Sequence, residues 1–288
     1  MGMPSAVIAA LVLLAGSPLA QAAGPVNIVA AENFYGDVAQ QIGGADVRVT
    51  SILSNPDQDP HMFEASPAVG RALSGARIAV MNGIDYDPWM EKLLGATRAA
   101  GRTTIVVAEL TGHKTGDNPH VWYDTATMRA YARALADALG AADPAHAGDY
   151  RKRLAQFADS LRPVEARIAA MKARLAGTPV TATEPVFGYV FAALGMTVRN
   201  MPFQMAVMND TEPSARDVAA FENDLKAHRV KLLVYNSQAA GPIAARMEKL
   251  ARASHVPVVA ATETEPPGRT YQSWMLEELD AVDRAVPN

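Results

Sequence analysis

The apolar residues between positions 143 and 177 recur at alternating steps of four and three, which places them on one stripe of a helix surface. Start and stop signals agree with this period, because Asp143 can cap the helix, Pro144 suits its first position, and Gly177 followed by Pro179 ends it. At 1.5 Å per residue this predicted connecting helix is about 50 Å long, the height of two small domains. The stripe comprises Tyr150, Leu154, Phe157, Leu161, Val164, Ile168, Met171 and Leu175.

Pro163 lies inside the predicted connecting helix and is expected to bend it, since proline removes one hydrogen bond of the helical ladder. We interpret the helix as a strut between two domains. The alternative is a pair of helices that meet near Pro163 within a single domain, because helices longer than 25 residues are uncommon.

Short β-branched runs alternate with helical stretches on both sides of the connecting helix. Before it, we predict strands at 26–30, 47–53, 77–81 and 103–108, with helices at 33–42, 66–73 and 87–94 and another capped by Asp124. After it, we predict strands at 179–183, 196–201, 230–235 and 257–261, with helices at 186–194, 214–228, 239–253 and 270–284.

Alternation of strands and helices is typical of parallel sheets covered by helices. The predicted fold class is therefore α/β, with two β/α lobes that have parallel-type sheets and are joined by one long helix. The predicted divisions are an N-terminal lobe at 24–142, the connecting helix at 143–177 and a C-terminal lobe at 178–288. Residues 1–23 are assigned to a signal peptide, as argued below.

The composition indicates a soluble protein with two packed cores. The chain has 288 residues, of which 49% are hydrophobic, and its mean hydropathy is close to zero. A net charge of -4 and a pI of about 5.9 provide no basic surface field, so nucleic acid is not an expected partner.

The N-terminal stretch has the pattern of a secretory signal. An unbroken apolar run at 6–14 is followed by Gly16, Pro18 and small residues, with a cleavage site after Ala22 or Ala23, although the usual basic residues are missing. A membrane anchor is the alternative, but the run is shorter than the roughly 20 residues that a spanning helix needs. The sequence contains no cysteine, so we expect neither disulfides nor a lipid on a processed cysteine. We therefore expect a free periplasmic protein.

Four side chains are candidates for a metal site. His61 and His120 end proline-containing loops, whereas Glu184 and Glu263 follow predicted strands. Ligands of open α/β sheets bind beyond the carboxyl ends of strands, so facing lobes would bring these groups together in the inter-lobe cleft. Imidazole favours Zn, Cu, Fe or Ni, and carboxylate shifts the preference toward Mn or Fe(II). Motifs for nucleotide binding and for nucleophilic catalysis are absent from the sequence.

Each candidate also has an ordinary structural interpretation. The histidines can be surface or hydrogen-bonded residues, Glu184 can stabilise a helix start, and Glu263 competes with Glu265. The remaining candidates are acidic or sulfur-containing. Asp57 and Asp59 are interpreted as loop-shaping residues, because the rest of a calcium-binding loop is missing. Three methionines could bind copper(I) through their thioether sulfurs, but we prefer packing in a core as their role; they are Met201, Met205 and Met208.

Three segments resemble the solute-binding proteins of ABC importers that take up zinc and manganese. They are Ala-Glu-Asn-Phe-Tyr-Gly at 31–36, Asn-Pro-Asp-Gln-Asp-Pro-His-Met-Phe-Glu at 55–64 and Asn-Pro-His-Val-Trp at 118–122, together with the single long helix. The resemblance implies that His61, His120 and Glu184 are metal ligands. The family's fourth ligand is usually an aspartate after the last strand, and here we prefer Glu263 to Glu265 because it lies nearer the strand end.

The resemblance further implies the function. Zinc-type members carry a histidine-rich loop between the first two ligands, and its absence here favours Mn²⁺, or both Zn²⁺ and Mn²⁺, with Fe²⁺ also compatible. We expect a periplasmic, monomeric binding protein that delivers the metal to an ABC permease and is not an enzyme. The alternatives are a secreted metal-dependent hydrolase, which would need an open coordination position and a base, and a metal-binding adhesin.

Overall fold

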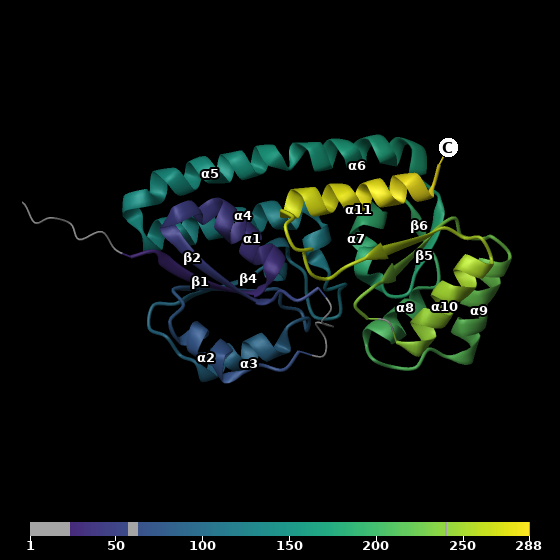
Figure 1. The fold of residues 1–288 in the computed structure, drawn as a ribbon, viewed down its shortest axis with the longest axis horizontal. Helices are drawn as coiled ribbons and strands as arrows, with labels where there is room; N and C mark the ends of the chain where they lie inside the picture. The colour runs from purple at the N-terminus through teal and green to yellow at the C-terminus, as the bar shows by residue number, and fades with distance from the viewer. Residues whose placement is uncertain (1–23, 57–62, 240, 288) are drawn as a thin grey trace, which may run out of the picture.

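The computed structural model describes residues 24–56, 63–239 and 241–287, which form two lobes side by side (Figure 1). The N-terminal sheet has the order β2-β1-β3-β4 and the C-terminal sheet the order β6-β5-β7-β8, and every paired strand is parallel to its neighbour. The predicted α/β class with two parallel sheets is confirmed. The strands are β1 Val26–Glu32, β2 Val47–Leu53, β3 Ile78–Met81, β4 Thr103–Val106, β5 Pro179–Ala182, β6 Thr197–Val198, β7 Leu233–Asn236 and β8 Val258–Ala261.

Helices cover both faces of the N-terminal sheet. Helices α1 (Asn33–Gly43) and α4 (Thr125–Ala142) lie on one face, and α2 (Pro67–Ser74) and α3 (Pro88–Ala96) lie on the other (Figure 1). Alternate residues of β1 serve the two faces, since Ile28 packs in the cluster that includes Val38 of α1, whereas Val29 packs in the cluster that includes Met90 of α3. A strand buried on both faces requires a continuous apolar run, which β1 has.

The C-terminal sheet is covered in the same way. Helices α7 (Gly188–Ala193) and α11 (Tyr271–Ala285) lie on one side, and α8 (Met201–Met208), α9 (Ala215–Lys226) and α10 (Pro242–Ala253) lie on the other (Figure 1). Leu233 of β7 packs with Phe221 and Met247 on the second side, whereas its neighbour Val234 belongs to the large cluster on the first side.

The predicted connecting helix is one 3₁₀ turn, η5 (Pro144–His146), followed by α5 (Ala147–Ser160) and α6 (Arg162–Leu175), which run in line across the top of both lobes (Figure 1). Leu161, between α5 and α6, keeps right-handed helical angles of φ -80° and ψ -17°. Its backbone N–H donates to Phe157 at 3.2 Å, and its carbonyl accepts from Glu165 at 3.1 Å. The ladder is interrupted here because Pro163 has no N–H to donate.

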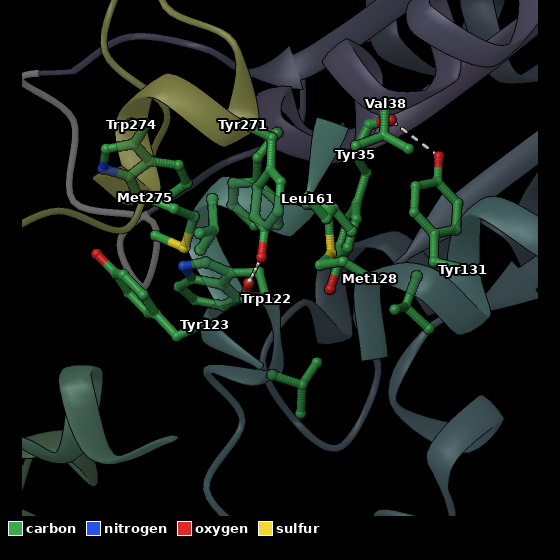
Figure 2. Close-up of a cluster of buried hydrophobic side chains, with 14 of the residues drawn as sticks. Tyr35, Val38, Trp122, Tyr123, Met128, Tyr131, Leu161, Tyr271, Trp274 and Met275 are labelled. Atoms are coloured by element: carbon green, nitrogen blue, oxygen red, sulfur yellow. Dashed lines mark hydrogen bonds between the residues drawn. The ribbon is translucent and has the colours of Figure 1, made fainter. Parts of the chain in front are cut away.

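The largest hydrophobic cluster extends through both lobes. Figure 2 shows its centre, where Tyr271 and Trp274 of α11 lie beside Trp122 of the 3₁₀ helix η4 (Val121–Tyr123). The hydroxyl of Tyr271 donates to the carbonyl of Trp122 at 2.7 Å, and the Trp274 ring lies 5.9 Å from the ring of Phe34 in α1. Both lobes therefore contribute to one hydrophobic core, in addition to being joined by the connecting helix.

Several predicted elements have other bounds in the structure, and strand β7, for example, begins at Leu233, later than the predicted 230. The predicted strand at 196–201 is only the two-residue β6, because Asn200 adopts a left-handed conformation with φ 61° and α8 begins at Met201. Strand β4 ends at Val106, and the 3₁₀ helix η3 (Ala108–Thr111) replaces its predicted end. Helix α10 begins at Pro242, later than predicted. Within the described ranges, none of the helices combines the length and the apolar character needed to cross a membrane.

Candidate metal centre

Three of the four predicted ligands lie together. His120, Glu184 and Glu263 each offer one ligand atom, and these atoms lie within 4.8 Å of one another. All three side chains are buried, with exposed fractions of 0%, 1% and 0%. We call this set the candidate cluster. His61 lies outside the described residues, and so do Asp57 and Asp59.

The parallel C-terminal sheet explains why two of these residues meet. Glu184 follows the end of β5, and Glu263 follows the end of β8. In the sheet, β7 lies between these two strands, so their carboxyl ends open at the same edge. Long-range contacts within the sheet thus bring together two glutamates that are far apart in sequence.

The N-terminal lobe supplies His120 at the start of η4. The preceding residue, Pro119, accepts a hydrogen bond from the side chain of Asn82 at 2.9 Å. Asn82 in turn accepts one from the hydroxyl of Tyr35 at 2.6 Å, and both residues are buried. The His120 backbone is therefore attached to β3 and α1, and the candidate cluster contains residues from both lobes.

The hydrogen bonds of Asn118 set the tautomer of His120. The Asn118 Oδ1 atom accepts the backbone N–H of His120 at 3.1 Å and lies 2.6 Å from its ring Nδ1. Because this oxygen can only accept, Nδ1 must carry the hydrogen. A neutral imidazole then has its lone pair on Nε2, the atom that lies 3.5 Å from Oε2 of Glu263. This is the arrangement in which a histidine binds a metal.

Asn118 also connects the lobes. Its side-chain NH₂ donates to the carbonyl of Pro185 at 2.7 Å, and its own carbonyl accepts from the hydroxyl of Tyr189 at 2.7 Å. A Cβ atom at Gly188 would lie 2.6 Å from the Asn118 amide nitrogen, so glycine permits this close approach. The residue that orients His120 is thereby held against the loop that carries Glu184.

The two glutamates share a buried amide. The Nδ2 atom of Asn236, at the end of β7, donates to Oε1 of Glu184 and to Oε1 of Glu263. The exposed fraction of Asn236 is 1%. Two neighbouring buried carboxylates repel each other, and these N–H groups, together with His120, offset part of that repulsion.

The surroundings of the candidate cluster are acidic. The Tyr86 ring lies 6.0 Å from the ring of His120. Burial raises the pKa of Tyr86 well above its usual range, and the negative charges of Glu263 and Glu32 raise it further, so the phenol keeps its proton. Burial likewise raises the pKa of Glu32, and the nearby charge of Asp87 adds to the increase. The charge that favours a cation as the ligand is therefore that of the two glutamates of the candidate cluster.

The backbone of Glu265, the alternative to Glu263, pairs with the side chain of Asn33 in the N-terminal lobe. Its backbone N–H donates to Oδ1 of Asn33 at 2.9 Å, and its carbonyl accepts from Nδ2 of Asn33 at 2.7 Å. Burial, together with the charge of Asp37, raises the pKa of Glu265 to about 9. Within the described residues, the candidate cluster includes Glu263 and not Glu265.

Sequence reasoning did not identify Asn118 or Asn236 as part of the site. Asn118 stands in the Asn-Pro-His motif, and Asn236 directly follows the predicted strand at 230–235. Asn236 thus follows a predicted strand, as Glu184 and Glu263 do. An uncharged amide at a strand end does not indicate a metal site, because it seldom binds a transition metal directly.

Known proteins share this architecture. The sequence model of the ZnuA family, described as zinc-uptake complex component A, periplasmic, matches residues 28–285. A putative metal-binding protein of Treponema pallidum is 23% identical over 278 residues, covering 90% of this chain and 86% of the relative. The manganese-binding lipoprotein MntA of Bacillus subtilis is 23% identical over 282 residues, covering 91% of this chain and 90% of the relative.

The fold is also found among solved structures. The periplasmic zinc-binding protein TroA of Treponema pallidum superposes with a TM-score of 0.77 at 18% sequence identity, covering 92% of this chain and 100% of that structure. The family match extends through both lobes and the connecting helix. The chain therefore belongs to the ZnuA family, whose members are metal-binding solute-binding proteins of ABC importers and not enzymes.

Proposed function

We propose that this protein captures Mn²⁺ or Zn²⁺ between its lobes and delivers the ion to the permease of an ABC importer. The observation that carries the proposal is the candidate cluster, in which an imidazole from one lobe and two carboxylates from the other lie buried within 4.8 Å. Relatives are named for binding manganese, zinc and iron, the last being YfeA of Yersinia pestis, so Fe²⁺ is also within the proposed range.

The proposed ligands are His61, His120, Glu184 and Glu263. Nε2 of His120 faces Glu263, and a divalent ion at this point would neutralise the two buried negative charges of the glutamates. The ion would also join the lobes, because its ligands come from both. We propose that release needs only a small displacement, since the shared core restrains the lobes from separating widely.

We further propose that the protein acts free in the periplasm and as a monomer. Residues 1–23, the proposed signal peptide, lie outside the described residues. MntA is named a lipoprotein, whereas the 288 residues of this sequence contain no cysteine to which a lipid could be attached. Fractionation of cells that express the chain, followed by mass analysis of the mature N-terminus, tests this part of the proposal.

Calorimetric titration of the metal-stripped protein with Mn²⁺, Zn²⁺ and Fe²⁺ tests the proposed function. We expect one ion per chain, with a rise in melting temperature because the ion binds the folded state alone. His120→Ala should abolish tight binding. The control His255→Asn changes an exposed histidine whose left-handed backbone, with φ 54°, suits asparagine, and it should bind as the wild type does. Tight binding by His120→Ala would refute the site.

A further inference from the structure

The backbone of Glu263 lies beyond the paired residues of the C-terminal sheet. The register of β7 and β8 ends at the pair Asn236 and Ala261, and the carbonyl of Ala261 accepts the backbone N–H of Ser237 at 3.1 Å. Glu263 and Thr264 follow, and both are buried, with exposed fractions of 0% and 1%. Because a buried backbone N–H needs an acceptor, these two residues require partners outside the sheet.

One side chain supplies the acceptor for both residues. Oε1 of Gln238, in the loop that follows β7, accepts the backbone N–H of Glu263 at 2.6 Å and that of Thr264 at 3.1 Å. Nε2 of Gln238 donates to the hydroxyl of Thr264 at 2.9 Å. A reversed amide would place its NH₂ against two N–H donors, so the oxygen of Gln238 must face the backbone of Glu263.

Gln238 is held in place by the loop to which it belongs. Its backbone N–H donates to Oδ1 of Asn236 at 2.9 Å. The other end of the same amide, Nδ2 of Asn236, donates to Oε1 of Glu263. Two residues of one loop therefore hold Glu263, since Asn236 bonds to its carboxylate and Gln238 bonds to its backbone.

The N-terminal lobe holds both ends of the segment 262–265. The carbonyl of Thr262 accepts from the hydroxyl of Tyr123 at 2.7 Å, and the backbone N–H of Glu265 donates to Oδ1 of Asn33 at 2.9 Å. The hydrogen bonds from Gln238 attach the middle of this segment, where Glu263 lies, to the C-terminal lobe. That lobe also carries Glu184, so these bonds fix the backbone of one glutamate relative to the other.

We infer that Gln238 is a positioning residue for metal binding, which acts through the backbone of Glu263 and not by contact with the ion. The inference rests on the proposed function, in which Glu263 is a ligand. A ligand whose backbone is already fixed loses little conformational freedom when the ion binds, and this pre-organisation strengthens binding. Without the two hydrogen bonds, the backbone of Glu263 would be freer to move and the ion would dissociate faster.

Two substitutions separate the hydrogen bonds of Gln238 from its size. Gln238→Met keeps the length of the side chain but offers only a weakly accepting sulfur, whereas Gln238→Glu keeps an oxygen that accepts both N–H groups. The hydroxyl of Thr264 can rotate to donate to that carboxylate. In calorimetric titration with Zn²⁺ and with Mn²⁺, we expect Gln238→Met to weaken binding about 10- to 100-fold, as is typical when a residue that orients a ligand is lost. Gln238→Glu should retain at least the wild-type affinity, because its negative charge also favours a cation.

Amide hydrogen exchange in the metal-free proteins supplies a second measurement, because it reports the backbone hydrogen bonds directly. We expect slow exchange at Glu263 and Thr264 in the wild type and in Gln238→Glu, and faster exchange in Gln238→Met. The control Gln156→Met changes an exposed glutamine of α5 and should alter neither the affinity nor the exchange. Circular dichroism verifies folding, and Gln238→Ala takes the place of Gln238→Met if that variant does not fold.

The results that would overturn the inference differ in what else they affect. If Gln238→Met keeps the wild-type affinity, and its melting temperature falls equally with and without metal, then Gln238 only supports the fold and the proposed function stands. The same conclusion follows if Gln238→Glu loses as much affinity as Gln238→Met, because the accepting oxygen would then not be what matters. Absence of binding of both ions by the wild-type protein would remove the proposed function and the inference together.

Discussion

Glu184→Gln should stabilise the metal-free protein and destabilise the metal-bound protein relative to the wild type. Ligand atoms of Glu184 and Glu263 lie within 4.8 Å of each other in a buried site. At that distance, with an effective dielectric constant of about 20, two full negative charges repel by about 3 kcal/mol. The hydrogen bonds from Asn236 to both carboxylates offset part of this repulsion, so we expect a gain of about 1–3 kcal/mol on substitution. Glutamine keeps an oxygen to accept the Asn236 hydrogen bond.

In the presence of metal, the wild type should be more stable than Glu184→Gln, because the bound ion is stabilised by the negative charge of Glu184 that the substitution removes. At a free ion concentration 1,000 times its dissociation constant, the wild type gains about 4 kcal/mol from binding. The variant binds more weakly and gains less at the same concentration. Thermal melts in a chelator and in excess Zn²⁺ provide the comparison, in which about 1 kcal/mol shifts the melting temperature by roughly 2–4 °C for a chain of this size.

Glu265→Gln is the matched control for this prediction. Glu265 is another buried glutamate of the C-terminal lobe, with an exposed fraction of 6%, but it lies outside the candidate cluster. Its replacement should change the melting temperature by the same amount with and without metal. A Glu184→Gln protein that melts below the wild type in chelator, or above it in Zn²⁺, would refute the reasoning.

Three further predictions concern stability and the orientation of the ligand. Burial raises the pKa of Glu278 from 4.5 to about 7, so the folded state should lose about 3 kcal/mol of stability as the pH rises between these values. Urea unfolding at pH 5 and at pH 8 measures this loss, which should be smaller in Glu278→Gln. Trp274→Ala should lower the free energy of unfolding by about 3–5 kcal/mol, because Trp274 is buried in the core that both lobes share, and a loss below 1 kcal/mol would contradict this assignment. Asn118→Ala should weaken metal binding about 10- to 100-fold in calorimetric titration, because the ring of His120 loses the acceptor that orients it, and unchanged affinity would contradict that role.

The periodicity of the sequence was sufficient to predict the two sheets and the connecting helix, because each element there has an apolar pattern matched to its own period. Helix α8 was missed because its start depends on the left-handed turn at Asn200, which apolar periodicity does not reveal. Its sequence is apolar almost throughout, so it has no polar face to distinguish a helix from a buried strand.

The strand ends in the sequence were enough to predict that two members of the candidate cluster would lie together, whereas its role in metal binding stays a prediction. The position of Glu184 and Glu263 beyond parallel strands follows from the fold class, and the structure brings both beside His120. The preference for Glu263 over Glu265 came from its position nearer the strand end, and the structure adds a reason that the sequence does not contain, the backbone pairing of Glu265 with Asn33 of the other lobe. The contact of Asn236 with both glutamates likewise depends on side-chain hydrogen bonds, which have no periodic signature.

Helix α11, the last helix of the described chain, completes the interior of the first lobe. The ring of Trp274 packs near Phe34, and the hydroxyl of Tyr271 bonds to the backbone of Trp122. A polypeptide that emerges from a ribosome or a translocation channel with its N-terminus first cannot bury these surfaces until the residues of α11 arrive. The hydrophobic core that both lobes share can therefore be completed only after the residues of α11 have been synthesised.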